Sequence, residues 1–234
     1  MKAMILAAGM GNRMRPLTLH TPKPLLEVGG KPLIVWHIEK LQAIGVTEIV
    51  INTAWLGDKL ATALGDGLQF GVNILWSHEG EGLETAGGII NALTLLGTEP
   101  FILVNGDVWT SMDFSCLLNV QLAEDLAHLV FVTNPEQHPQ GDFTLVNGRA
   151  YTFEQQQQGE ALTYSGVAVI DPKMFEGLEG GKRPLAPLLK QAMLEQKISA
   201  SKMHAVWVDV GTPERLNVLD QQIKRGLYAQ VRIH

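Results

Sequence analysis

Strand-like and helix-like segments alternate regularly through the first 110 residues, and this alternation restricts the fold more than any other feature. The apolar segments typical of buried strands are residues 2–8, 46–53, 71–79 and 100–108. The amphipathic segments typical of helices are residues 31–45, 55–66 and 85–97. Because parallel strands need long crossovers, the pattern predicts an α/β fold with a parallel sheet, helices on both faces, and ligands at the carboxyl ends of the strands.

The pattern becomes less regular after about residue 128, although no linker or repeat divides the chain. The segment "GDFTLVNGRAYTFE" predicts a hairpin that turns at Asn147-Gly148. Strands are expected at 127–134, 162–172 and 205–211 and helices at 184–196 and 212–226, with Thr212 as an N-cap. We therefore predict a single domain over residues 1–234.

Charge and composition exclude several classes of protein. The formal net charge of −6 argues against a surface that coats nucleic acid. No apolar run reaches the roughly 20 residues that span a bilayer, and the N-terminus does not resemble a signal peptide. The single cysteine, Cys116, is interpreted as a small buried residue and cannot form an intrachain disulfide. We expect a cytoplasmic protein without membrane or nucleic-acid partners, either a monomer or a small homo-oligomer.

The first strand runs directly into the glycine-containing stretch "LAAGMGNRMRP", which indicates a phosphate site. A dinucleotide fingerprint would need a third glycine where Met14 stands and an acid where the second strand ends on Asn52. The G-x-x-x-x-G-K-[ST] loop of ATPases is also missing from the sequence. Gly9 and Gly11 instead expose backbone amides, and Arg13 adds a planar cation suited to phosphate oxygens.

A lysine follows this loop in the segment "TPKPL". Lys23 lies between Pro22 and Pro24, which restrict the backbone and reduce the freedom that the lysine loses when it binds a ligand. Two aspartates, Asp107 and Asp209, follow apolar strands, so we expect both at the carboxyl ends of core strands. A pair of carboxylates beside phosphates suits Mg²⁺.

These motifs together resemble those of the sugar-1-phosphate nucleotidyltransferases. The resemblance rests on "LAAGMGNRMRPLTLHTPKPLL", "VNGD" and "VDVGTPE" and covers essentially the whole chain. It implies a three-layer Rossmann-like fold with a mixed, mostly parallel central sheet flanked by helices. Residues 1–127 would mainly bind the nucleotide and residues 128–234 the sugar, with no room for the C-terminal β-helix domain of many relatives.

Within this family, "EGEGLETAGGI", "LVNGDVWT", "QGDF" and "HAVWVDVGT" are most similar to the uridylyltransferases that act on N-acetylmuramate α-1-phosphate in cell-wall recycling. The resemblance implies transfer of UMP from UTP to a sugar 1-phosphate, with release of pyrophosphate and with Mg²⁺ on Asp107 and Asp209. Arg13 and Lys23 would be catalytic. The implied nucleotide-binding residues are Ala7, Ala8, Gly9, Gly11, Asn12, Arg13, Lys23, Thr85 and Gly88.

The sugar half offers candidates of more varied kinds. The substrate-binding residues that we expect are Asn105, Gly141, Glu154, Ser165 and Gly166. Glu154 is equally explained as a surface acid, and Glu84, which replaces a glycine of many relatives, as a residue that complements a helix N-terminus. The lactyl carboxylate of muramate needs a donor, for which Arg149, Lys182 and Arg183 are candidates that the sequence does not place.

Two other functions remain open at this stage. The same fold could join glucose 1-phosphate to dTTP or UTP, or mannose 1-phosphate to GTP. A non-catalytic regulator that binds nucleotide sugars is the alternative of another class. It is disfavoured because such a protein would be expected to lose Arg13, Lys23 or the two aspartates, all of which are present.

Overall fold

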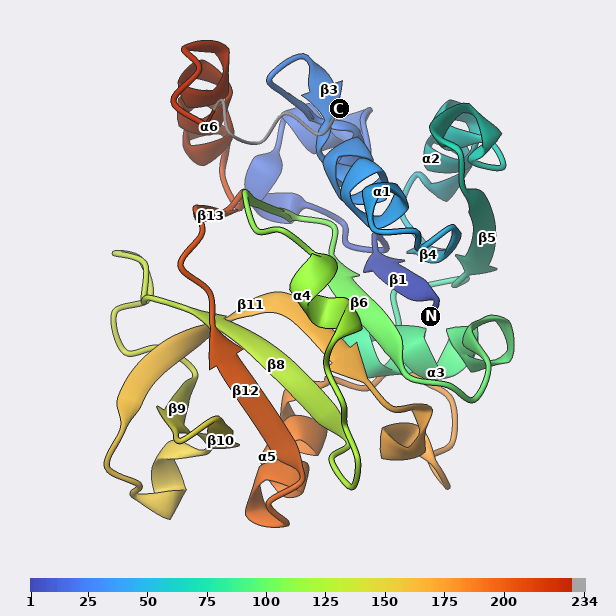
Figure 1. The fold of residues 1–234 in the computed structure, drawn as a ribbon. Helices are drawn as coiled ribbons and strands as arrows, with labels where there is room; N and C mark the ends of the chain where they lie inside the picture. The colour runs from blue at the N-terminus through green and yellow to red at the C-terminus, as the bar shows by residue number, and fades with distance from the viewer. Residues whose placement is uncertain (229–234) are drawn as a thin grey trace.

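Nine strands form one continuous sheet in the computed structural model, which describes residues 1–228 (Figure 1). These strands are β1 (Ala3–Leu6), β4 (Glu48–Thr53), β5 (Asn73–His78), β6 (Phe101–Asn105), β8 (Ala127–Val132), β9 (Phe143–Val146), β10 (Arg149–Tyr151), β11 (Glu160–Ile170) and β12 (Ile198–Lys202). Their order in space is β5-β4-β1-β6-β11-β8-β12-β10-β9. Two short ribbons lie outside this sheet: β2 (Glu27–Val28) with β3 (Lys31–Pro32), and β7 (Val108–Thr110) with β13 (Trp207–Asp209).

The two halves of the sheet differ in strand direction. β5, β4, β1 and β6 pair in parallel, as the alternation of strands and helices predicts. β11 is antiparallel to both β6 and β8, so the direction changes where the second half begins. β8 and β12 are again parallel, whereas β10 is antiparallel to β12 and β9. The sheet is therefore mixed, and the α/β fold class is confirmed.

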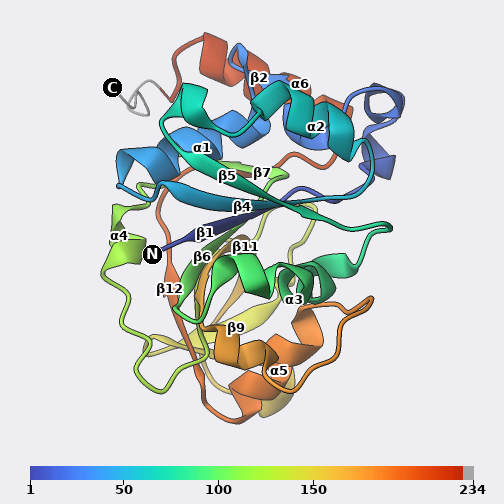
Figure 2. The same ribbon diagram turned by 90° about the vertical axis from the view of Figure 1, so that its right-hand side faces the viewer.

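Helices cover both faces of the sheet and produce three layers (Figure 2). The α-helices in residues 1–228 are α1 (Leu33–Ala43), α2 (Gly57–Leu64), α3 (Glu84–Leu96), α4 (Ser115–Leu118), α5 (Ala186–Leu194) and α6 (Pro213–Lys224). Side chains of α1, α2 and α4 pack on one face, and those of α3 and α5 on the other. Successive β1 residues serve the two cores, with Ile5 in the first and Met4 in the second. None of these helices is long and apolar enough to cross a bilayer.

In the second half of the sheet, one long strand, β11, pairs with different neighbours along its length. β9 pairs with β10 and also with the first residues of β11, while the later residues of β11 pair with β6 and β8. The hairpin between β9 and β10 turns at Asn147-Gly148, as expected, and both residues have positive φ. The register of β11 shifts between Tyr164 and Val167, which produces a bulge beside the end of β6.

Three details differ from the sequence-based predictions. β13 lies in a ribbon with β7 and not in the core sheet, because β11 already occupies the position beside β6. β12 was missed because "ISASK" is short and largely polar, without a periodic apolar signal. Cys116 is exposed on α4, because Leu117 is the residue of that turn that enters the core.

His37 of α1 is buried and neutral. The Nε2–H of His37 donates at 2.8 Å to the carbonyl of Val108, the residue that follows Asp107. Burial lowers the pKa of His37 from 6.5 to about 4, an effect that the bond to Val108 only partly offsets. His37 thus anchors α1 to β7.

This lowered pKa predicts a pH dependence of stability. Between pH 6.5 and about 4 the unfolded chain binds a proton at His37 that the folded chain does not, so the free energy of unfolding falls as pH falls. A shift from 6.5 to about 4 amounts to a loss of about 3 kcal/mol once pH 4 is reached. Urea unfolding at pH 7 and pH 4.5 should show a smaller loss for His37→Gln than for the wild type; equal losses would contradict this assignment.

Candidate active site

The carboxyl ends of β1 and β6 meet at a cavity of about 490 Å³. The N–H of Gly106 donates to the carbonyl of Leu6 at 2.9 Å, and a Cβ at Gly106 would lie 2.6 Å from that oxygen. Glycine therefore lets the two strand ends approach closely. Several of the expected nucleotide-binding residues line this cavity, namely Ala7, Ala8, Gly9, Gly11, Asn12, Arg13, Lys23 and Thr85.

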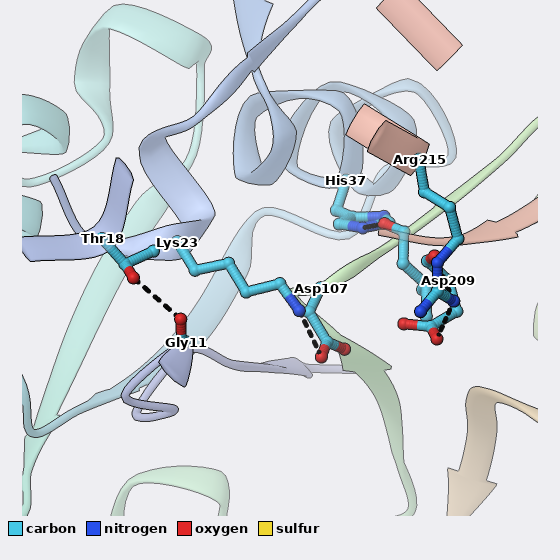
Figure 3. Close-up of polar contacts among 8 residues, drawn as sticks. Gly11, Thr18, Lys23, His37, Asp107, Asp209 and Arg215 are labelled. Atoms are coloured by element: carbon cyan, nitrogen blue, oxygen red, sulfur yellow. Dashed lines mark hydrogen bonds and ion pairs between the residues drawn. The ribbon is translucent and has the colours of Figure 1, made fainter. Parts of the chain in front are cut away.

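The loop after β1 is held by one glycine and one buried methionine. Gly11 has φ +61°, and its carbonyl accepts a hydrogen bond from the Thr18 hydroxyl at 2.7 Å (Figure 3). Met14 is fully buried and packs in a cluster with residues that include Trp109 of β7. This anchor explains why the position does not carry the third glycine of a dinucleotide fingerprint. Arg13, one residue earlier, is exposed and lines the cavity.

Lys23 and Asp107 form an ion pair across the cavity (Figure 3). Lys23 opens a short 3-10 turn, Lys23–Leu25, in which Pro24 occupies a position that needs no N–H donor. Its Nζ lies 2.9 Å from Oδ2 of Asp107. The lysine side chain is only 8% exposed, whereas the aspartate side chain is 42% exposed. The lysine is therefore fixed in place, while its partner remains accessible to a ligand.

The ribbon of β7 and β13 brings the two expected metal ligands together from distant parts of the chain. Asp209 pairs with Val108 in this ribbon, and the N–H of Val210 donates to the carbonyl of Asp107 at 3.0 Å. Arg215, on the first turn of α6, binds Oδ2 of Asp209 at 2.5 Å and its carbonyl at 3.1 Å (Figure 3). Arg215 was missed in the sequence, where it reads as an ordinary helical cation.

The donor chemistry of this pair fits a hard divalent cation. In residues 1–228 no group of three or more His, Cys, Asp or Glu side chains could hold a metal by itself. Mg²⁺ does not need such a group, because it keeps several waters and is commonly shared by one or two carboxylates and substrate phosphates. Asp107 and Asp209 supply two such carboxylates, near the glycine-containing loop that follows β1.

Part of the cavity wall belongs to a buried polar network, and the sequence did not predict this network. Oδ1 of Asn52 accepts the N–H of Ala7 at 2.8 Å, and its Nδ2 donates to Oε1 of Glu79 at 2.6 Å. The other oxygen of Glu79 accepts the N–H of Leu83 at 2.8 Å. Asn52 and Glu79 both line the cavity. Gly88 does not line it; a Cβ there would lie 2.5 Å from Glu79, so this glycine makes room for the network.

A second cavity, of about 270 Å³, continues from the first and shares Arg13, Asn105 and Asp107 with it. Ser165 lies in its wall and is fully buried, with its hydroxyl donating to the carbonyl of Val130 at 2.7 Å. Gly166 has φ +79°, and its Cβ would lie 2.7 Å from the Asn105 side chain. The β11 bulge thus packs closely against the Asn105 side chain, which lines both cavities.

The remaining sugar candidates lie outside both cavities. Glu154 is exposed on the surface, with its carboxylate 3.6 Å from Nζ of Lys190 on α5. Gly141 is buried, and a Cβ there would lie 2.7 Å from the carbonyl of Leu162. The structure therefore assigns Gly141 a role in packing a turn, and it does not bring Glu154 to the cleft.

The position of Glu84 has a backbone explanation. Glu84 is the first residue of α3 and has φ +60°, a conformation that favours glycine. A glycine at this position, as the family resemblance implies, would suit the local backbone. The carboxylate of Glu84 forms no capping hydrogen bond and lies 4.0 Å from Nζ of Lys182. The acid nevertheless lies in the first turn of α3, where a negative charge complements the helix N-terminus, as the sequence suggested.

The family model described as "Nucleotidyl transferase" matches residues 2–225 of this chain. The chain belongs to the nucleotidyl transferase family. This nucleotidyltransferase is 52% identical to the N-acetylmuramate alpha-1-phosphate uridylyltransferase of Neisseria meningitidis serogroup B over 92% of its own length and 95% of that protein. It is 30% identical to the mannose-1-phosphate guanyltransferase of Schizosaccharomyces pombe, of which it spans 62%.

Solved structures show the same fold. A Bacillus anthracis protein described as a glucose-1-phosphate thymidylyltransferase superposes with a TM-score of 0.83 at 22% identity, with 95% of each chain covered. The inositol-1-phosphate CTP transferase of T. maritima superposes with a TM-score of 0.77 at 18% identity and covers 99% of this nucleotidyltransferase and 96% of the other chain. At these identities the comparison supports the Rossmann-like nucleotidyltransferase fold and not a choice of substrate.

Proposed function

We propose that this nucleotidyltransferase transfers UMP from UTP to N-acetylmuramic acid α-1-phosphate and releases pyrophosphate. The observation that carries the proposal is the 52% identity to a uridylyltransferase of that substrate over nearly the full length of both proteins. A cleft in which a glycine loop, a lysine and two aspartates converge supports it. The product is the UDP-linked form of a cell-wall sugar, which fits a role in peptidoglycan recycling.

The reaction joins two anions, so positioning and charge compensation dominate its catalysis. An oxygen of the sugar phosphate attacks the α-phosphorus of UTP; the new P–O bond forms as the bond to the bridging oxygen breaks, and pyrophosphate leaves with that electron pair. The backbone amides at Gly9 and Gly11, together with Arg13, would hold the departing phosphates. Lys23, fixed beside Asp107, would compensate charge at the reacting phosphate.

A divalent cation, which we propose to be Mg²⁺, would be held by Asp107 and Asp209. When bound, it would neutralise phosphate charge and help to orient the two substrates. Arg215 and Lys23 hold these carboxylates in place through their ion pairs. Asn105 and the β11 bulge would contact the sugar side of the acceptor.

A substrate panel tests the proposal. Pyrophosphate release should be measured for UTP, dTTP and GTP with the 1-phosphates of N-acetylmuramic acid, N-acetylglucosamine, glucose and mannose. We expect the highest kcat/KM with UTP and N-acetylmuramic acid 1-phosphate, and loss of turnover when EDTA removes the metal. Restoration by Mg²⁺ completes the assignment of the cofactor.

Two results would contradict the proposed function. A higher kcat/KM with glucose 1-phosphate or mannose 1-phosphate would show that the enzyme prefers another sugar phosphate. Binding of UTP without turnover of any pair, measured by calorimetry on the same preparation, would favour the non-catalytic regulator.

A further inference from the structure

The second cavity carries few basic side chains, and this limits how it can recognise a charged sugar. Its wall holds the carboxylates of Asp107 and Asp209 and the basic side chains of Arg13 and His138. Arg13 also lines the first cavity, where we place the phosphates. His138 is therefore the basic residue of this wall to which no phosphate contact is assigned.

The basic residues that the sequence suggested for a sugar carboxylate are engaged or placed elsewhere. Nη1 of Arg149 binds both carboxylate oxygens of Asp125, at 2.9 and 2.8 Å. Lys182 lines the first cavity and lies near Glu84. Arg183 follows it in the same loop, and none of these three basic residues lines the second cavity.

His138 is oriented by a carboxylate that is itself fixed. Its Nε2–H donates to Oδ1 of Asp142 at 3.0 Å. The other oxygen, Oδ2, accepts the N–H of Tyr164 on β11 at 2.8 Å. Gly141 forms the turn between His138 and Asp142. Its N–H donates to the carbonyl of His138 at 3.2 Å, and its φ is positive. Nδ1 of His138 forms no hydrogen bond within residues 1–228 and is available to a ligand.

We infer that His138, oriented by Asp142, binds the lactyl carboxylate that distinguishes N-acetylmuramic acid from N-acetylglucosamine. This inference rests on the proposed function. An imidazole ring has two nitrogens and can therefore bridge two carboxylates, and charge-assisted bonds of this kind are stronger than neutral ones. N-acetylglucosamine offers only a hydroxyl where muramate carries the lactyl ether, so it gains no such bond. His138 is thus a specificity-determining residue and Asp142 a positioning residue.

Binding of two nucleotide sugars to the wild type and to His138→Gln tests this assignment. UDP-N-acetylmuramic acid and UDP-N-acetylglucosamine differ only in the lactyl ether, so their dissociation constants, measured by titration calorimetry, isolate its contribution. For UDP-N-acetylmuramic acid we expect Kd to rise about 10- to 100-fold in His138→Gln, the usual effect of losing a hydrogen bond to a charged group. Kd for UDP-N-acetylglucosamine should not change, which also shows that the variant is folded.

Two further variants separate the charge effect from general damage. His128→Gln is the matched control, because His128 on β8 bonds the hydroxyls of Ser199 and Ser201 and lines neither cavity. It should leave both constants unchanged. Asp142→Asn keeps an acceptor but removes the charge behind the imidazole, so it should weaken UDP-N-acetylmuramic acid less than His138→Gln does.

The outcomes distinguish this inference from the function on which it rests. Equal changes for the two nucleotide sugars in His138→Gln, or no change in either, would overturn the role of His138 alone. Wild-type enzyme that turns over glucose or mannose 1-phosphate but not N-acetylmuramic acid 1-phosphate would overturn both the proposed function and this assignment.

Discussion

Lys23→Met should lower kcat by about 10²- to 10³-fold, the range found when one preorganised charge-stabilising group is removed from an active site. Methionine keeps much of the apolar stem of the buried side chain but removes the charge that contacts Asp107. The lost stabilisation arises where negative charge gathers in the transition state, so kcat should fall more than KM rises. Steady-state kinetics with UTP and N-acetylmuramic acid 1-phosphate measure both constants.

A matched control tests whether the effect belongs to this lysine. Lys59→Met removes an exposed lysine whose Nζ donates to the carbonyl of His20, and it should leave kcat unchanged. The thermal midpoint of Lys23→Met should stay close to that of the wild type, because Asp107 remains partly accessible to water. A folded Lys23→Met enzyme with normal kcat would show that Lys23 is only structural.

Asp107→Asn should lower turnover by at least about 10²-fold at a fixed Mg²⁺ concentration, because a neutral amide is a poorer ligand for a hard cation. The amide oxygen can still accept the hydrogen bond from Lys23, so the fold should persist. The concentration of Mg²⁺ that gives half-maximal activity should rise, and direct Mn²⁺ binding, followed by electron paramagnetic resonance, should weaken in parallel.

Asp58→Asn, on the first turn of α2 and outside both cavities, is the control for this change and should alter neither turnover nor Mn²⁺ affinity. Normal turnover of Asp107→Asn would remove the basis for the metal assignment. Reduced turnover with unchanged Mn²⁺ affinity would instead assign Asp107 to holding Lys23.

The parts of the fold that follow from local patterns were predictable. Buried strands such as Phe101–Asn105 are continuous apolar runs, and the hairpin at Asn147-Gly148 carries its own turn residues. The loop at Gly9 and Gly11, Lys23 and the two aspartates were identified from residue types that have few other uses in such a combination, and the structure gathers them in one cleft.

The parts that depend on tertiary pairing were not predictable. Arg215 is an unremarkable helical residue until the turn from β13 into α6 places it against Asp209, which pairs with Val108 across the ribbon. Asn52 counted in the sequence only as a missing acid, yet its amide links the loop after β1 to Glu79. The Asn52 contacts join residues 45 and 27 positions apart, and the role of Arg215 depends on where the ribbon places Asp209, so local periodicity carries no signal for either.

The ribbon between β7 and β13 has a consequence for how the enzyme matures. One carboxylate of the proposed metal pair is synthesised in the first half of the chain, and its partner only near residue 209. The cluster that anchors Met14 also includes Val210 and Leu219, so the loop after β1 and the pair of aspartates both depend on the last part of the chain, and competence to transfer a nucleotide would arrive in a single late step.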